Sequence, residues 1–383
     1  MQAWSQAWQA QGKEGEEMLA GHKKIFLGKQ KKKDGTVKNI FLPVKKNGVV
    51  LVISKPRTGK SAMVKEIALR LYEFERSLLI IDSIGKGEYD ATTKMNYRAK
   101  YPQAIENLKV IKNFVLPLGA FNTIDDFVSL GFSDDAATYM NRWLRKKYLQ
   151  DFKNFDEFLD ALPISSGYLQ AFNAQYLEHG IILRTHLPYQ TKGNIIAHWQ
   201  KIKGWFWKGP QDKRQLLNAK ILQRIWEKHK YVCLQVDMRP GEEAKSCSYI
   251  GNLLKNIDDR FLKKMAPTII VEESDLICPN KSLQARTLTS RDMLRFFVNK
   301  KLRYNMVIFF ITQNDSLLDE DVVNSAFEKI IGLVDKKSRF WEHAKYNRLK
   351  VVDRIPRSDF VYIDVNGWAS RFYPKITSCG CQS

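Results

Sequence analysis

The residues best suited to chemistry form one short string, Ser54-Lys-Pro-Arg-Thr-Gly59-Lys60-Ser61. The apolar run over 49–53 predicts a strand before it, and the spacing of apolar residues predicts a helix over 61–75 after it. Backbone N–H groups of such a loop and of the first helical turn point at one spot, where the helix dipole adds partial positive charge. The string therefore predicts a loop that binds the phosphates of a nucleotide, and we expect ATP.

Two side chains of this loop have separate expected roles. Lys60 is expected to reach the β- and γ-phosphates, and the Ser61 hydroxyl is expected to bind Mg²⁺. One residue departs from the usual pattern, because Ser54 stands where such loops open with glycine, whose backbone adopts conformations that a side chain disfavours. The expected nucleotide contacts are Ser54, Lys55, Pro56, Arg57, Thr58, Gly59, Lys60, Ser61 and Ala62.

Two adjacent carboxylates follow another apolar run, Thr268-Ile-Ile-Val-Glu272-Glu273. Nucleotide hydrolysis needs an acidic group to hold Mg²⁺ and a group to position the attacking water. We expect Glu272 to serve the metal and Glu273 to act as the base. The alternative is an ordinary strand end with two solvated acids. Gln313, which follows a third apolar run, is expected to contact the γ-phosphate or the attacking water.

The elements that position these residues alternate along the chain. Helices are expected over 61–75, 245–257 and 290–299, and strands over 49–53, 77–81, 231–236, 268–271, 306–311, 330–334 and 360–365. Strands joined through helices indicate a mainly parallel sheet and the α/β class.

Four regions are expected from composition. Residues 1–22 read as a polar tail, and 23–100 as a β-hairpin (runs 25–27 and 40–44) followed by the first part of the core. Residues 101–230 read as a mostly helical insertion or lid, rich in aromatic side chains that either stack on bases or belong to a core. Residues 231–383 read as the second part of the core with C-terminal strands.

The charge of the 383-residue chain indicates its partner. A formal net charge of +21 favours a polyanion, nucleic acid before an anionic membrane. The lysines of 29–33 either contact phosphate or form a solvated turn. No apolar run approaches the ~20 residues of a membrane-spanning helix, and the N-terminus lacks the apolar core of a signal peptide. We therefore expect a cytoplasmic protein, found in host cytoplasm or a virion if it is viral.

Taken in order, these motifs resemble the FtsK–HerA superfamily of P-loop ATPases, which pump DNA as ring hexamers. The resemblance spans roughly 49–90 and 231–335. The string Gly85-Lys-Gly-Glu88-Tyr89 after Asp82 looks like the family's Asp…Gly-Glu-Tyr element, 269–279 looks like its Walker B strand, and 302–332 looks like its sensor strand and following helix. Ser54 and Glu272 replace the family's usual residues.

The resemblance implies a RecA-like core, ATP hydrolysis coupled to DNA translocation, a homo-oligomer in the form of a hexameric ring, and sequence-independent binding of double-stranded DNA. It further implies that Gln313 senses the γ-phosphate and that an arginine from the neighbouring subunit completes the site. Arg303 is the first candidate, with Arg291 and Arg295 as the others. Short members without a membrane segment look most like viral genome-packaging ATPases or plasmid-borne relatives, with a capsid or transfer apparatus as partner.

Two other functions remain open from the sequence. One is a non-motor nucleotide-binding protein, such as a signalling NTPase or a nucleotide kinase, which leaves the large positive charge unexplained. The other is a basic nucleic-acid-binding protein with a degenerate nucleotide site, which the departures at Ser54 and Glu272 permit. DNA-stimulated ATPase activity separates the motor from both.

Overall fold

The computed structural model describes residues 24–32, 34–43, 47–83, 89, 95–121, 123–138, 141, 164–165, 187–206, 208, 211–238, 242–280, 288–334, 359–366 and 368–374. The predicted tail at 1–22 and the string Gly85–Glu88 lie outside these residues. Within the described ranges, no helix has the length and apolar character needed to cross a bilayer.

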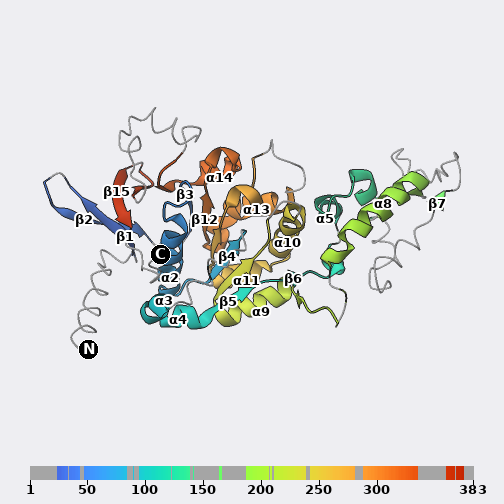
Figure 1. The fold of residues 1–383 in the computed structure, drawn as a ribbon, viewed down its shortest axis with the longest axis horizontal. Helices are drawn as coiled ribbons and strands as arrows, with labels where there is room; N and C mark the ends of the chain where they lie inside the picture. Colours follow the sequence, from blue (N-terminus) through green and yellow to red (C-terminus); the bar gives the residue numbers. More distant parts are fainter. Residues whose placement is uncertain are drawn as a thin grey trace.

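An 11-stranded sheet runs through the body in the order β2-β1-β15-β14-β13-β3-β12-β11-β4-β10-β5 (Figure 1). From β13 to β5 every neighbouring pair of strands is parallel, which confirms the predicted α/β class. These strands are β3 (Gly48–Ile53), β4 (Leu78–Asp82), β5 (Leu108–Ile111), β10 (Tyr231–Gln235), β11 (Thr268–Val271), β12 (Val307–Thr312) and β13 (Glu328–Ile331).

The central strands are apolar along their whole length because helices cover both faces of the sheet. Side chains alternate along β3: Val49 and Leu51 belong to one core cluster, and Val50 and Val52 to the other. The second cluster includes residues of α2 (Lys60–Glu73) and α4 (Pro102–Asn107). The first includes residues of α9 (Ala219–His229), α10 (Glu243–Lys255), α11 (Asp259–Met265), α13 (Leu288–Tyr304) and α14 (Glu320–Ser325).

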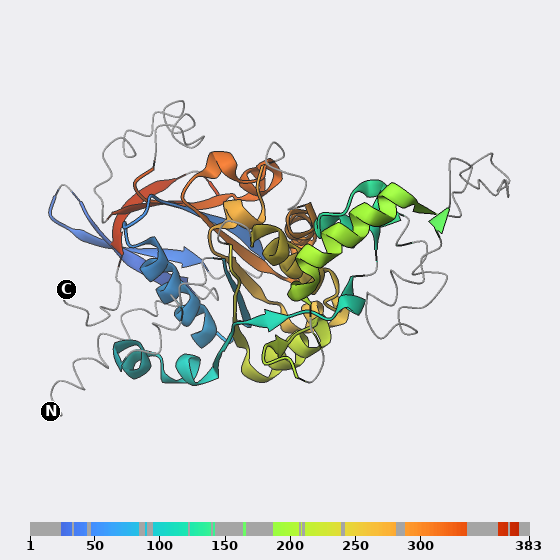
Figure 2. The same ribbon diagram turned by 45° about the vertical axis from the view of Figure 1, so that its right-hand side comes forward.

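One end of the sheet is antiparallel. Beside β13 lie β14 (Phe360–Ile363) and β15 (Ala369–Pro374), then β1 (Lys24–Lys31) and β2 (Val37–Pro43). The pairing of β1 with β2 confirms the predicted hairpin. In Figures 1 and 2 this hairpin extends away from the body of the molecule.

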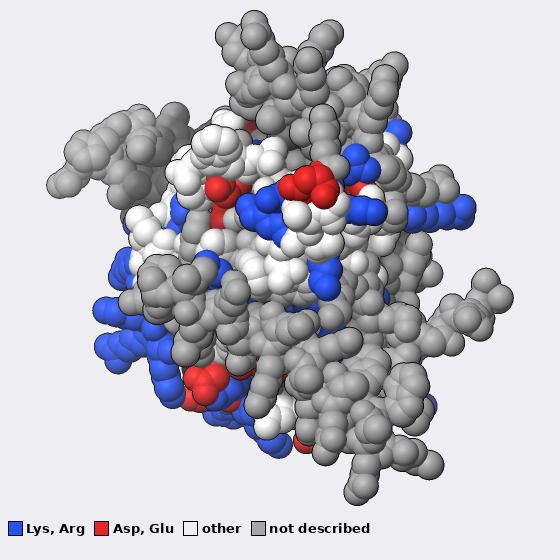
Figure 3. Space-filling model, turned by 90° about the vertical axis from the view of Figure 1, so that its left-hand side faces the viewer, with Lys and Arg blue, Asp and Glu red and all other residues white. Residues whose placement is uncertain are grey.

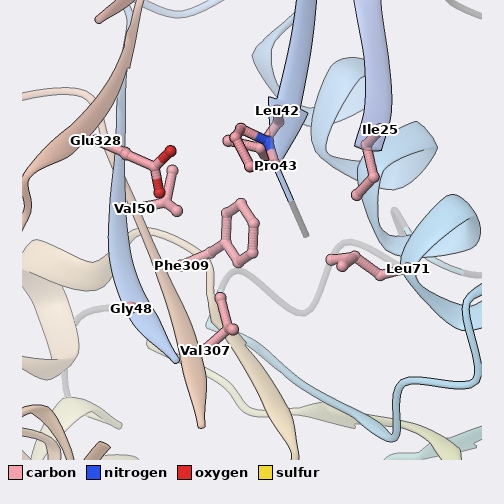
Figure 4. A pocket seen from close by; sticks show the side chains of 9 residues that line it. All are labelled: Ile25, Leu42, Pro43, Gly48, Val50, Leu71, Val307, Phe309 and Glu328. Carbon is pink, nitrogen blue, oxygen red and sulfur yellow. The ribbon is translucent and has the colours of Figure 1, made fainter. Parts of the chain in front are cut away.

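The base of the hairpin packs on the sheet around a small apolar cavity (Figure 4). Its lining is contributed by the hairpin, by three central strands and by Leu71 of α2, and comprises Ile25, Leu42, Pro43, Gly48, Val50, Leu71, Val307, Phe309 and Glu328. Glu328 is the one acidic group of this lining, and its carboxylate accepts a hydrogen bond of 2.6 Å from the Tyr362 hydroxyl. The hairpin is thus attached to the sheet through apolar contacts.

The region 101–230 contributes both to the sheet and to a lateral extension. Its strand β5 pairs with β10 at the edge of the main sheet. Helices α5 (Ile124–Ser129) and α8 (Tyr189–Ile202) lie together on the side opposite the hairpin (Figures 1 and 2). Trp199 and Phe206 are buried and stack with ring centroids 5.5 Å apart. These two aromatic residues therefore belong to a core and are not positioned to stack on bases.

Candidate nucleotide-binding and catalytic site

The predicted phosphate loop joins β3 to α2. Helix α2 begins at Lys60, and its N-cap Gly59 has a φ of 87°, a left-handed conformation that glycine adopts without steric cost. No side chain caps this helix end in the described structure, and its first turn carries no acidic residue. The first N–H groups of α2 therefore face an anion-binding position with the positive end of the helix dipole behind them.

Ser54, the residue that departs from the usual loop, is fully buried. Its hydroxyl lies 2.6 Å from that of Thr58, which also donates to the Lys55 carbonyl at 2.9 Å. Among the described loop residues, positive φ occurs at Arg57 (62°) and Gly59, not at Ser54. A side chain at this position is therefore accommodated without the backbone conformation that requires glycine.

The space for Ser54 comes from Gly332, which follows the neighbouring strand β13. A Cβ atom on Gly332 would lie 2.3 Å from Ser54 Oγ and 2.9 Å from a ring carbon of Phe360. Backbone hydrogen bonds hold the two segments together, since Gly332 donates to the Ile53 carbonyl and Lys55 donates to the Leu333 carbonyl. The serine at one position thus depends on glycine at the other.

Three of the predicted site residues meet at one edge of the sheet. The Glu273 carboxylate accepts a hydrogen bond of 2.7 Å from Gln313 Nε2, and Lys60 Nζ lies 3.4 Å from the same oxygen, Oε1. The ammonium and the carboxylate are both largely buried, so water screens their attraction little. These side chains follow β11, β12 and β3, whose carboxyl ends meet because the three strands are parallel neighbours.

Glu273 also has an unusual backbone, with φ 42° and ψ 53°. This left-handed conformation is uncommon for a residue other than glycine. Glu273 lies two residues after the end of β11 and is the N-cap of the short helix α12 (Ser274–Ile277), so the chain turns sharply at the carboxylate. The turn directs the Glu273 side chain toward Lys60 and Gln313.

Glu272 is held by two groups that follow β4, the strand next to β11. The Tyr89 hydroxyl donates a hydrogen bond of 2.7 Å to Glu272 Oε1, and Ser83 Oγ donates one of 2.7 Å to the Glu272 carbonyl. Burial first, and then the charge of Glu272, raises the pKa of Tyr89 well above its usual value, so the tyrosine remains a donor. Asp82, which ends β4, is also buried at this edge.

A further carboxylate, Asp275, lies two residues after Glu273. It accepts a hydrogen bond of 2.6 Å from the hydroxyl of Thr312, the residue before Gln313. Burial raises the pKa of Asp275; the Thr312 hydrogen bond opposes this shift, and the charge of Glu273 adds to it. This contact could not be predicted from the sequence, because Asp275 and Thr312 are brought together only by the pairing of β11 with β12.

The three candidate arginines occupy different parts of α13. Arg291 is buried beside Asp292, and Arg295 forms ion pairs with Asp319 and Asp321. The Arg303 side chain is 60% exposed and lies 3.4 Å from Asp259. It precedes β12, whereas Gln313 follows this six-residue strand, so roughly 20 Å of sheet separate the two positions. Arg303 is therefore too far away to complete the site of its own chain.

The residues at this edge fit a nucleotide with Mg²⁺. The uncapped start of α2 and the buried Lys60 suit phosphate oxygens, and the carboxylates suit a hard cation. Mg²⁺ usually retains several waters and is held by one or two carboxylates and the substrate phosphates, so Ser61 and Glu272 would be enough.

No protein-family model matches the chain, and no curated protein sequence matches it. Its fold is similar to several solved structures. VirB4 of Thermoanaerobacter pseudethanolicus is 15% identical, with a TM-score of 0.52 over 92% of this chain and 96% of that one. The bacterial conjugative coupling protein TrwB is 12% identical, with a TM-score of 0.53 over 90% of this chain and 89% of that one.

The genome packaging NTPase B204 from Sulfolobus turreted icosahedral virus 2, in complex with AMPPCP, is 11% identical and has a TM-score of 0.38 over 87% of this chain and 100% of that one. TrwB has also been solved with the ATP analogue ADPNP. The RecA-like fold that the motifs led us to expect is confirmed by this likeness. The chain has the RecA-like P-loop NTPase fold that VirB4 and TrwB also have.

Proposed function

We propose that the chain is an ATP-hydrolysing DNA translocase that works as a homo-oligomeric, hexameric ring in viral genome packaging or plasmid DNA transfer. The observation that carries the proposal is the convergence of Lys60, Glu273 and Gln313 at the ends of three adjacent parallel strands. A phosphate ligand, a base and a γ-phosphate sensor are the groups that ATP hydrolysis needs. The net charge of +21 and the likeness in fold to a conjugative coupling protein support DNA as the partner.

Each residue has a defined task in this proposal. Lys60 turns from Glu273 to the β- and γ-phosphates, and the start of α2 binds the phosphate oxygens. Once released by Lys60, the Glu273 carboxylate accepts a proton from the attacking water, while Gln313 keeps that carboxylate oriented and contacts the γ-phosphate. Ser61 and Glu272 would hold Mg²⁺, which would supply positive charge to neutralise the phosphate oxygens. Tyr89 fixes the orientation of Glu272.

The decisive variant is Glu273→Gln. It keeps the size of the side chain and its contact with Gln313 but removes the base. We expect ATP hydrolysis to fall by roughly 10²-fold or more, the range typical of general base catalysis, while the affinity for an ATP analogue stays close to that of the parent protein. Steady-state ATPase assays with and without duplex DNA, together with analogue titrations, measure both quantities.

The matched control is Glu106→Gln, which makes the same change at an exposed position on α4. It should hydrolyse ATP at the parental rate. Equal rates in the Glu273→Gln variant and the parent would remove Glu273 from the proposed chemistry. If the parent protein hydrolyses ATP but neither binds DNA nor is stimulated by it, the proposal of an ATPase stands and the proposal of a translocase is refuted.

A further inference from the structure

The hairpin β1–β2 is divided into a base and an arm. In the base, Ile25, Leu27, Ile40 and Leu42 are each 5% exposed or less and pack into the second core cluster. In the arm, which we define as the described residues of 29–39, every side chain except the half-buried Gln30 is exposed. The same two strands therefore change along their length from an apolar anchor to a polar extension.

The arm carries positive charge on both of its faces. Lys29 and Lys31 alternate with Gln30 along β1, and Gln30 pairs across the ribbon with Lys38. Lys29, Lys31, Lys32 and Lys38 are exposed, and none of them forms an ion pair within the described part of the chain. Four cations thus point into solvent from a narrow ribbon.

The one described acid of the arm, Asp34, is occupied in the turn. It accepts hydrogen bonds from the Thr36 hydroxyl at 2.6 Å and from the Thr36 amide at 2.9 Å, and these bonds lower its pKa. Figure 3 views the molecule from the end that bears the hairpin, where blue side chains predominate over red ones among the described residues. The field at this end therefore attracts anions.

The base connects the arm to the nucleotide site. Arg70 of α2 donates a hydrogen bond to the Phe26 carbonyl of β1, and its guanidinium lies 5.9 Å from the centre of the Phe26 ring. Leu71, the next residue of α2, lines the cavity beneath the hairpin. Strand β1 lies between β2 and β15 in the sheet and pairs with both. The helix that begins at the phosphate loop is thus in direct contact with the base of the basic arm.

We propose that the arm of hairpin β1–β2 binds duplex DNA by contacting its phosphates, as the element through which the translocase grips its substrate. This inference rests on the proposed function. A two-stranded ribbon fits the major groove of B-DNA, which is about 12 Å wide, and lysines on both faces then reach the phosphates of both strands. Because the lysines contact phosphates and not base edges, this binding is independent of sequence.

The composition of the arm favours DNA over an anionic membrane. Segments that bind at a membrane surface combine basic residues with Trp, Phe or Leu that enter the interface. The arm has no aromatic residue, and Val37 is its one large apolar side chain. The arm is therefore suited to contact the phosphates on the surface of a polyanion and lacks the apolar side chains that would enter a membrane.

The test is a triple substitution, Lys31, Lys32 and Lys38→Gln, which removes charge from both faces and leaves the base intact. We measure binding of a fluorescent 30-bp duplex by anisotropy at several salt concentrations. The slope of log K against log salt should become less steep by up to about 2.7, since each lost phosphate contact contributes about 0.9. The affinity at 0.1 M salt should fall by about tenfold or more, with an unchanged midpoint of thermal unfolding.

The matched control removes three exposed lysines elsewhere, Lys220, Lys228 and Lys263→Gln, on α9 and α11. It should bind nearly as tightly as the parent protein.

Equal losses of DNA affinity in both variants would show that net charge, not the arm, determines binding and would overturn the inference. The inference alone fails if the parent binds DNA and the arm variant binds equally well. If the parent does not bind DNA, the translocase proposal fails too. Loss of binding to anionic vesicles with DNA binding intact would assign the arm to a membrane and overturn the inference.

Discussion

At the scale of single residues, the site is a set of carboxylates held close together. Glu272, Glu273 and Asp275 follow one strand, and each has a different partner: Tyr89, Gln313 with Lys60, and Thr312. The three carboxylates are close together in the sequence, but their different partners suit them to different roles. Because Tyr89 binds Glu272 and Thr312 binds Asp275, Glu273 is the carboxylate that contacts both Lys60 and Gln313.

Asp275 gives a prediction with a defined sign. Its pKa is raised from the ordinary value of 3.8, so the folded protein holds this proton more tightly than the unfolded chain does. Stability that depends on the proton is present at low pH and is lost as pH rises through the window between 3.8 and the raised value. Asp275→Asn cannot ionise and can still accept the Thr312 hydrogen bond. We therefore expect the unfolding temperature of the parent, measured relative to that of the variant, to fall as the pH rises above 3.8. Parallel curves for the two proteins would contradict this.

At the scale of elements, the sequence predicted most of the central sheet. The runs at β3, β11 and β12 are continuous, apolar and rich in β-branched residues, and strands buried on both faces require this composition. The phosphate loop and the two glutamates could be found because they directly follow such runs. Contacts between elements could not be found, because they depend on the order of strands in space. The dependence of Ser54 on Gly332 is an example, since it exists only because β13 lies beside β3.

This dependence can be measured between the two elements. Gly332→Ala places a methyl group against Ser54 and Phe360, and overpacking of this kind costs about 1–3 kcal/mol. We expect a lower unfolding temperature and a weaker affinity for an ATP analogue, because the phosphate loop must shift. Adding Ser54→Gly should restore part of both, since it removes the serine hydroxyl and Cβ.

The control for this pair is Gly119→Ala, because nothing lies within 4 Å of a Cβ built at Gly119. It should leave the analogue affinity unchanged. If Ser54→Gly restores nothing to the Gly332→Ala protein, the two positions are independent.

At the scale of the whole molecule, we propose that a complete hydrolysis site requires a second subunit. An arginine that meets the charge of the transferred phosphoryl group typically contributes 10³–10⁵ in rate. Arg303 lies at the opposite end of β12 from Gln313 and is exposed, so it can serve only a neighbouring chain. This remains a proposal for Arg303, with Arg291 and Arg295 as alternatives.

Mixing two inactive variants tests the shared site. Lys60→Ala lacks the phosphate ligand and Arg303→Ala lacks the arginine, so each alone should have little ATPase activity. In mixed rings some interfaces join an intact loop to an intact arginine, and we expect part of the activity to return in the presence of DNA. The hypothesis of a shared site is wrong if no such mixture, including those with Arg291→Ala or Arg295→Ala, regains activity and the protein stays monomeric with ATP and DNA.

The left-handed backbone at Glu273 makes stability and activity compete at one position. For a residue with a side chain this conformation costs about 1–2 kcal/mol, whereas glycine adopts it freely and loses roughly 0.5–1 kcal/mol more chain entropy on folding. Glu273→Gly should therefore have a higher free energy of unfolding than Glu273→Ala, by up to about 1.5 kcal/mol in denaturant titrations, because both variants lack the carboxylate with its contacts and differ only in the Cβ atom. A Gly variant no more stable than the Ala variant would show that the turn holds no strain. The folded protein thus gives up part of its margin of stability to keep a carboxylate at the position proposed for the base.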